Sequence, residues 1–548
     1  MDTALGAFGA LDVVLRRSME GLSFWQRIKG SSDSAKHFSI LLEWQRTKLQ
    51  NWKDGWSIES NKDYRQDHRF RTHEQLIMKN LRAIHSILDD FANLDAPEPL
   101  LTQSNCIQAA NHLGAFSGPR DGGNSKTPSL PSTQGIKWVL QEDRLKYDLD
   151  LLTKMIDNLV SFIPPPRHDP ARTLILSDLI TTRDPNDLVR ISRADIDDPL
   201  VASLAWIKSF SYHPDGAYVG NHQLQSSLLV PIDRNDNRTK FMARYQGELV
   251  LVEKKDCTAA WNQVAQLNIL KVRIDKIVDR LQTPKQPTGL RTLPCQGSVV
   301  IRDKPSAEDK TTWTYNIVYR ADYPRFTSLR NLLSQKKTVP GNRNLANAHF
   351  PLEKQFILAQ TLARAIMYLH LADWLHKAVR SENVVFFIND ENRIQTHLPY
   401  LVGFEYSRLD VTDEQTENVE FKPDHRFYRH PEAMVVPISG LQQPLGGPGR
   451  YSKVYDIYSM GVVLLEIGRF MSARSITEEY GLSKLATLVD IRNVFVEKAI
   501  PDLRSTMGEA YAGAVLTCLD GSLDMFVGHS LHRAFYEKVV CQLDTCLA

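Results

Sequence analysis

The sequence has few cysteines and lacks any apolar run long enough to span a membrane. Its six cysteines are scattered over 548 residues, and none forms a C-x-x-C pair or stands at metal-ligand spacing with histidine. This spacing excludes a disulfide framework and a zinc motif, and it predicts a protein of the reducing cytoplasm. No stretch reaches the roughly 18 apolar residues that a membrane span needs. The N-terminus also lacks the pattern of a secretory signal.

An excess of charge of one sign is also missing. Lysine and arginine total 66 against 64 aspartates and glutamates, which leaves a formal charge of +2. No global field draws such a chain to nucleic acid or to anionic lipid. We therefore expect no nucleic-acid partner, and any contact with membrane lipids must come from a local patch. Hydrophobic residues at 42% and charged residues at 24% are typical of globular domains.

Apolar residues at helical spacing dominate the first part of the chain. Two strong stripes lie within residues 77–91 and 145–163, and two weaker ones lie within residues 4–22 and 38–52. Spacings of three and four residues place such side chains on one face of a helix, so four amphipathic helices predict an all-α bundle. The first helix opens with ALGAFGALDVVL and is apolar almost all round except at Asp12. It is therefore a candidate for insertion into a membrane interface.

Two breaks in composition delimit this bundle. Residues 103–135 lose the periodicity and are crowded with Gly, Ser, Pro and Asn, which predicts a long mobile loop before the fourth helix. The segment IPPPRHDP at residues 163–170 cannot continue a helix, because proline lacks the backbone N–H. We therefore expect the bundle to cover residues 1–165 and a linker to cover residues 166–204.

Beyond the linker the pattern changes to short β-like runs. They lie at residues 226–231, 240–244, 247–253, 297–302 and 313–319, with a helical stretch at 259–281, and long helical patterns follow from residue 352. Five strands interrupted by a helix after the third is the order of a protein-kinase N-terminal lobe. The second half is therefore predicted to be an α+β, two-lobed, protein-kinase-like fold, with an N-lobe at 205–335 and a C-lobe at 336–548.

Four motifs occur in the order of kinase motifs. The run WLHKAVRSENVVFF at residues 374–387 has the layout of the catalytic loop H-R-D-L-x-x-x-N, with His376 at the His position and Asn383 at the metal-binding Asn. The sequence VGFE at 402–405 falls where D-F-G belongs, and YRHPE at 428–432 falls at A-P-E. The run DIYSMGVVLLE at 456–466 resembles a helix of kinase C-lobes.

The positions that carry kinase chemistry are degenerate. Phosphoryl transfer needs one carboxylate to accept the proton of the substrate hydroxyl and another to hold Mg²⁺ against the phosphates. These positions are Ala378 and Gly403, and neither residue can accept a proton or bind a hard cation. No GxGxxG precedes the third strand. We therefore predict no catalytic residue and no metal site.

Residues of the ligand-binding type remain near the end of the third strand. Lys254 and Lys255 are candidate nucleotide-binding residues together with Asn383, and strand alternation leaves open which lysine faces the cleft. The following helix contains no glutamate, so Asp275 or Asp279 is its only candidate acidic partner.

Two further charged residues have alternative interpretations. Arg380 stands at the usual position of the catalytic-loop lysine, where it either binds a phosphate or pairs with Glu405. Glu405 stands at the Gly of D-F-G and is a candidate for a displaced metal-binding carboxylate.

The whole chain resembles a fungal family that joins an N-terminal prion-inhibition and propagation (HeLo or HeLo-like) domain to a kinase-like C-terminal domain. The resemblance is carried by LVLVEKK, RTLPCQG, SLRNLLSQ, LVGFEYSR and the 374–387 loop, and by LLEWQRTKLQNWKDGW, which is similar to the HeLo helix with a Leu-x-x-Trp pattern. It implies that Ala378 and Gly403 are features of the family. It also implies a role in regulated cell death or non-self recognition.

These features predict a pseudokinase-type signalling protein. Its kinase-like domain would control an N-terminal bundle that is recruited from the cytoplasm to the plasma membrane, with membrane lipids and an upstream receptor or a second copy of the chain as partners. We expect no cofactor in this case. One alternative is a divergent active Ser/Thr kinase that binds ATP and recruits Glu405 or Asp373. The other is a cytosolic adaptor without a membrane step.

Overall fold

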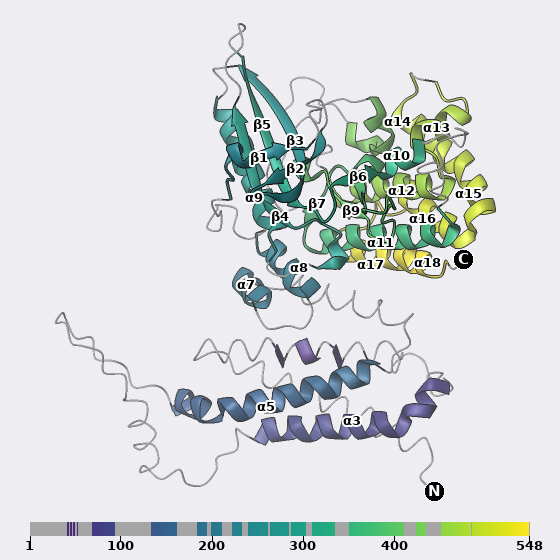
Figure 1. Ribbon diagram of the computed structural model, residues 1–548. Coiled ribbons are helices and arrows are strands. Elements are labelled where there is room, and N and C mark those ends of the chain that lie inside the picture. Colours follow the sequence, from purple (N-terminus) through teal and green to yellow (C-terminus); the bar gives the residue numbers. More distant parts are fainter. Residues whose placement is uncertain are drawn as a thin grey trace, which may run out of the picture. The chain divides into compact units, whose positions relative to one another are not determined.

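The protein, analysed as a computed structural model, divides into two compact units, residues 1–175 and 176–548. Figure 1 follows the chain through both units. The residues that the structure describes are parts of 41–52 and then 68–93, 133–161, 184–193, 199–210, 222–232, 239–260, 264–283, 287–302, 310–334, 350–409, 423–434, 451–483 and 485–546.

The first unit is helical in its described residues. Helices α3 (His68–Asn93) and α5 (Thr133–Ser161) pack together and against helical residues of 41–52. The strong apolar stripes of the sequence are confirmed, since their described members are buried in one core. Nearly all of the predicted loop 103–135 and the whole predicted first helix, 4–22, lie outside the described residues. Among the described helices, none is long and apolar enough to cross a membrane.

The second unit begins with two short helices in a segment that was predicted to be mostly linker. Helix α7 (Pro185–Arg193) packs on α8 (Pro199–Ser209), and α8 contacts α9 and α11 of the same unit. Most residues of these two helices fall within the predicted linker 166–204, so this part of the chain is helical. The sequence was misread because α8 is apolar on all sides and shows no amphipathic period, as expected of a helix buried all round.

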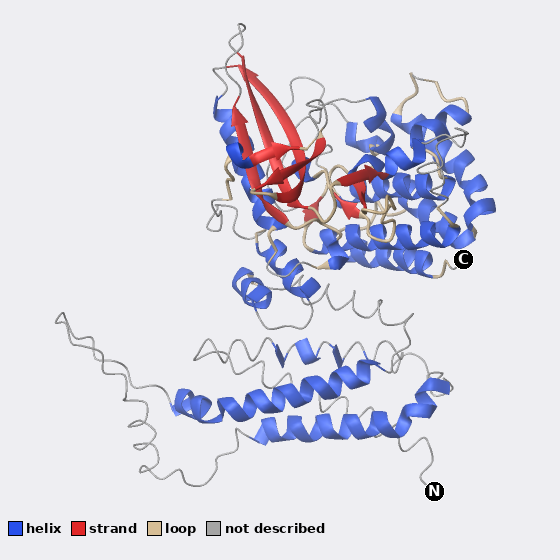
Figure 2. Cartoon of the chain, viewed as in Figure 1, coloured by secondary structure: helices blue, strands red, loops and turns tan. Residues whose placement is uncertain are grey.

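A curled antiparallel sheet follows, in the strand order β1-β2-β3-β5-β4. Figure 2 shows these strands in red beside the helical remainder of the unit. The bounds are β1 (Leu229–Pro231), β2 (Lys240–Tyr245), β3 (Glu248–Ala260), β4 (Cys295–Arg302) and β5 (Lys310–Arg320). Each of the five predicted strands has a counterpart, although residues 226–228 of the first form a 3₁₀ turn rather than a strand. One face of the sheet buries a cluster of valines that includes Val250, Val252 and Val318.

Helix α9 (Val264–Leu281) packs against β3, β4 and β5. It begins later than the predicted 259, because β3 continues to Ala260 in register with β5, where Ala260 pairs with Lys310. The paired backbone hydrogen bonds of this long hairpin override the helical pattern of the sequence at 259–260.

The rest of the second unit is mainly helical. Helix α11 (Leu352–Leu371) and helix α12 (Lys453–Arg469) confirm the helical patterns predicted from residue 352 onward and at 456–466, and both are largely buried. Helices α15 (Ile500–Met507) and α16 (Glu509–Leu519) pack on α12. The remaining elements are α10 (Leu329–Ser334), α13 (Ala473–Glu479), α14 (Leu488–Asn493), α17 (Gly528–Phe535) and α18 (Cys541–Asp544), with two π-helical segments at Val494–Ala499 and Tyr536–Val540.

Short strands lie where the sheet-bearing and helical parts of the second unit meet. Strands β6 (Arg325–Ser328), β8 (Val384–Ile388) and β9 (Tyr400–Leu401) form one small antiparallel sheet, and β7 (Trp374–Leu375) pairs with β10 (Arg408–Leu409). These strands bracket residues 374–409, so the loop segments with the kinase-like motifs are held between paired strands.

The contact between α12 and α16 leaves no room for a side chain at Gly461. A Cβ there would lie 2.6 Å from Cys518 Cβ, whereas a Cβ at Gly513 on α16 would meet nothing within 4 Å. We expect Gly461→Ala to lower the free energy of unfolding by about 2 kcal/mol through overpacking. Gly513→Ala should be neutral or stabilise by up to about 1 kcal/mol through helix propensity. Urea unfolding of the two variants tests this, and equal stabilities would contradict the packing.

Candidate functional site

The loop at residues 376–383 is anchored by a buried carboxylate. Asp456, on the first turn of α12, accepts hydrogen bonds from the backbone N–H of His376 (2.7 Å) and of Lys377 (2.8 Å). Tyr451 donates its hydroxyl to the same carboxylate, and His370 Nε2 lies 3.3 Å from it. Burial would raise the pKa of Asp456, but these hydrogen bonds outweigh it and lower the pKa. Lys377 is therefore held in a left-handed conformation at φ = 65°.

The ring of His376 packs inside the loop. Its centroid lies 4.5 Å from that of Phe404, which also lies 5.0 Å from the ring of Trp374. Burial lowers the pKa of His376 to about 4, so the imidazole is neutral at physiological pH. His376 is therefore a packing residue that links the loop to the 403–406 segment.

Asn383 binds a lysine from the sheet. Its amide nitrogen donates to the carbonyl of Ala378 across the loop (2.7 Å), and its Oδ1 accepts from the ammonium of Lys240 on β2 (2.6 Å). A charge-assisted bond of this length contributes roughly 1.5–3 kcal/mol. The candidate ligand residue Asn383 therefore has both ends of its amide occupied, one by its own loop and one by a cation of the chain.

Gly403 leaves no space for a carboxylate. It lies in the left-handed region at φ = +94°, and a Cβ added there would lie 2.2 Å from Nδ2 of Asn383. The backbone of Val402 donates to the carbonyl of Asn383 (3.0 Å), which fixes this close approach. An aspartate could not stand at position 403 without moving Asn383. A set of residues that could hold Mg²⁺ in the manner of a kinase is therefore not present at Asn383 and Gly403.

Two glutamates form an acid pair near Asn383, of which Glu253 is buried and Glu405 is partly buried. Glu253 lies on β3 and Glu405 lies in the 3₁₀ turn Phe404–Tyr406, and Tyr319 donates its hydroxyl to Glu253 (3.0 Å). Burial and the negative charge of Glu405 raise the pKa of Glu253 well above its usual value. Burial would also raise the pKa of Glu405, but its interaction with Glu253 and the charge of Lys240 lower it. These opposite pKa shifts favour the proton on Glu253 and the negative charge on Glu405.

Lys255, and not Lys254, is turned toward this pair. Its ammonium donates to the carbonyl of Glu405 (3.3 Å) and lies 4.3 Å from the ring centroid of Tyr406. Glu253 and Lys255 share a face of β3 because side chains alternate along a strand, and Lys254 belongs to the opposite face. The predicted acidic partners on α9 bind elsewhere, since Asp279 lies 2.5 Å from His222 and Asp275 3.7 Å from Lys271.

Arg380 pairs with its own loop. Its Nε lies 3.0 Å from Glu382, and its guanidinium lies 3.3 Å from His425 Nδ1, while His425 Nε2 lies 2.7 Å from the same glutamate. Burial would raise the pKa of Glu382, but the hydrogen bond from His425 and the charge of Arg380 lower it. Arg380 therefore pairs with Glu382 rather than with Glu405.

Sequence reasoning missed the residues that complete the site. In the sequence, Lys240 and Glu253 look like ordinary residues of two strands, and Tyr319 looks like an apolar residue of a third. The strand register brings them close to Asn383 and Glu405, which stand far away in the sequence. A buried polar residue in an otherwise apolar run, such as Glu253 after Val252, was the only signal available. Among the described residues, no group of three or more His, Cys, Asp or Glu side chains could hold a metal ion.

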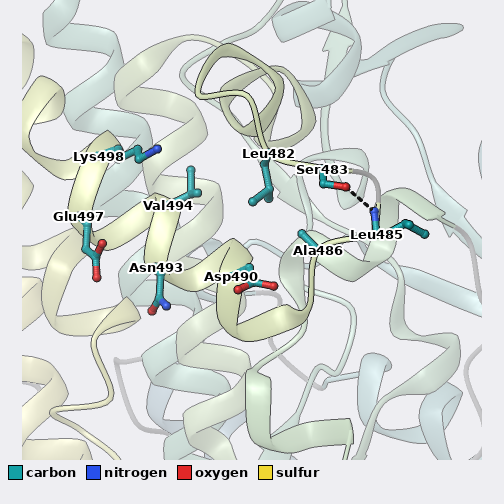
Figure 3. A pocket seen from close by; sticks show the side chains of 9 residues that line it. All are labelled: Leu482, Ser483, Leu485, Ala486, Asp490, Asn493, Val494, Glu497 and Lys498. Carbon is teal, nitrogen blue, oxygen red and sulfur yellow. Dashed lines mark hydrogen bonds between the residues drawn. The ribbon is translucent and has the colours of Figure 1, made fainter.

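A separate cavity lies on the helical part of the second unit. It has a volume of about 410 Å³ and is shown in Figure 3. It lies between the turn that carries Leu482 and Leu485 and the helical residues Asp490, Val494 and Lys498. None of the predicted site residues lines it.

The close approach of Gly403 to Asn383 can be tested by substitution. We expect Gly403→Ala to lower the free energy of unfolding by about 3 kcal/mol, because it adds a clash to the strain of a left-handed alanine. Gly481 is the matched control, since it also has a positive φ of +71° but no atom within 4 Å of an added Cβ. Gly481→Ala should cost about 1 kcal/mol. Equal losses in urea unfolding would contradict the contact.

Comparison with protein families follows the division of the chain. The HeLo family model, described as prion-inhibition and propagation, matches residues 3–191. Such a domain suggests a membrane-targeting protein of the cell-death or incompatibility type. A second family model matches residues 261–548 and does not identify them as a kinase. The search of curated proteins gives no match. The chain carries an N-terminal HeLo domain, and over more than half its length it belongs to the family described as domain of unknown function DUF7580.

Proposed function

We propose that this chain is a signalling protein of regulated cell death or heterokaryon incompatibility. A kinase-like domain with lobes at 205–335 and 336–548 senses an upstream signal without phosphoryl transfer, and it controls an N-terminal helical domain that acts on membranes. The HeLo match supports the membrane role, and the order of strands and motifs in the second unit supports the kinase-like part.

The bond between Lys240 and Asn383 is the observation that carries this proposal. A kinase holds Mg²⁺ with an asparagine after the catalytic loop and with the aspartate of D-F-G. Under the motif alignment, the asparagine here binds an ammonium at 2.6 Å, and the aspartate position is a glycine that cannot carry a Cβ. The ammonium of Lys240 therefore occupies the Asn383 oxygen that a metal ion would need. The domain thus keeps a fixed shape without a nucleotide or a metal.

The alternative interpretation, an active kinase, requires a free carboxylate. Glu405 is partly buried, and its interactions with Glu253 and with the charge of Lys240 lower its pKa, so turning toward a phosphate would break these internal interactions. Asp373 lies between two lysine ammonium groups, at 2.7 Å from Lys453 and 3.0 Å from Lys208. The carboxylates of Glu405 and Asp373 therefore both interact with other groups of the chain.

We expect ATP with Mg²⁺ to leave the melting temperature unchanged and to give no phosphorylation of the chain. A ligand at 100 times its Kd would stabilise the folded state by about 2.7 kcal/mol, which a thermal-shift assay resolves easily. Glu405→Gln is the control, because it would abolish any turnover that uses this carboxylate. A Mg²⁺-dependent shift together with phosphorylation that Glu405→Gln removes would establish the active-kinase alternative.

We expect the full chain to bind anionic vesicles through residues 4–22, which the sequence predicts to be an amphipathic helix. Changing Leu11 and Leu15 together to Asp should weaken binding at least tenfold, because each change places a charge on the apolar surface that enters the interface. Leu76→Asp is the matched control, since Leu76 is 47% exposed on α3. Flotation of the three proteins measures the bound fraction. Absence of binding by the unaltered chain at any lipid composition would favour the adaptor alternative.

A further inference from the structure

A buried cluster of charges lies where α8 meets the rest of the second unit. Lys208, near the end of α8, lies 3.0 Å from one oxygen of Asp373, and Lys453, at the start of α12, lies 2.7 Å from the other. The two lysine residues are only 2% and 5% exposed. Asp373 has a positive φ of 54° and directly precedes β7, which leads into the 376–383 loop. The cluster therefore connects α8 with the loop of the candidate site.

The other group that faces the cluster is neutral. Nε2 of His532 on α17 lies 3.1 Å from the ammonium of Lys453, and burial lowers the pKa of His532 to about 2. The imidazole therefore supplies no charge at physiological pH. Lys208 and Lys453 share the carboxylate of Asp373, and the positive charge of Lys453 disfavours the charged form of Lys208.

The remaining contacts of α8 are mostly apolar. Eight apolar or small residues of this eleven-residue helix are buried: Leu200, Val201, Ala202, Ser203, Leu204, Ala205, Ile207 and Ser209. Trp206 adds a hydrogen bond from its indole N–H to the carbonyl of Asp279 on α9 (3.1 Å). The side chain of Leu200 packs beside Gly289. Apolar burial therefore favours docking of α8, whereas the desolvation of Lys208 opposes it.

We propose that α7 and α8 form a releasable coupling element, which docks on α9 and α11 and is kept close to release by the buried charge of Lys208. This inference rests on the proposed function and describes how the action of the helical domain would be regulated. The HeLo match extends to residue 191, within α7, yet α7 belongs to the second compact unit. A signal that moves the 374–383 loop would shift Asp373 and undock α8.

Release would change the reach of the helical domain. Residues 185–209 are folded into two helices while they are docked. Once extended, this segment would add up to about 80 Å to the tether, at roughly 3.3 Å per residue. The docked element thus keeps these residues out of the tether to the helical domain, and the undocked element adds them to the reach of that domain toward a membrane or a second copy.

Two substitutions in the cluster, with opposite expected effects on the docking of α8, test this proposal. Asp373→Asn leaves two buried ammonium groups without their shared carboxylate, so hydrogen exchange of the α8 amides in the full chain should become at least about a hundredfold faster. Lys208→Met removes the surplus ammonium and leaves the pair of Asp373 and Lys453 intact, so the same amides should exchange more slowly, by about fivefold. Lys498→Met, at an exposed lysine, is the matched control and should change nothing.

Faster exchange in Lys208→Met would overturn the proposal, because the lysine would then secure docking. Unchanged exchange in that variant would overturn it as well. If Asp373→Asn fails to fold, the exchange rates of Lys208→Met alone decide whether the proposal holds.

Flotation with anionic vesicles separates the inference from the proposed function. The coupling element predicts a several-fold larger bound fraction for Asp373→Asn than for the unaltered chain. Altered exchange without any change in a measurable bound fraction would refute control by α8. Absence of binding by every variant would instead refute the membrane role itself.

Discussion

The buried carboxylate of Asp456 is the interaction on which the candidate site depends. It accepts two backbone N–H groups of the 376–377 turn and a tyrosine hydroxyl, and it is fully buried. Without these bonds the loop would carry unsatisfied N–H groups in a dry interior, which is a strongly unfavourable state. The position of the turn fixes the neighbouring Asn383, and Asn383 in turn fixes Gly403 and Lys240. One carboxylate on α12 therefore determines the geometry of residues from the helices and from the sheet.

The same loop lies between two sets of internal charges. On the sheet side, Lys240 and Lys255 contact Asn383 and the backbone of Glu405. On the side of α8, Asp373 binds Lys208 and Lys453. Charges that a catalytic domain would offer to ligands are here paired within the chain. Such pairing suits a domain that transmits a change of shape, because movement of the loop alters both sets together.

The sequence predicted those features that depend on local periodicity. The stripes of α3 and α5, the strands β2 and β3, and the helix α12 all followed from the spacing of apolar residues. It could not predict pairings across long separations, such as Lys240 with Asn383 or Lys208 with Asp373, because no local pattern marks the partner. Helix α8 was missed for the opposite reason, since a segment that is buried all round has no polar face to give it a period.

The most direct test of the central claim is a crystal structure of the protein grown with saturating ATP and Mg²⁺. The account predicts that Lys240 Nζ remains bonded to Asn383 Oδ1 and that no metal lies between Asn383 and Glu405. A Mg²⁺ ion coordinated by Asn383 and Glu405, with Lys240 displaced, would contradict it.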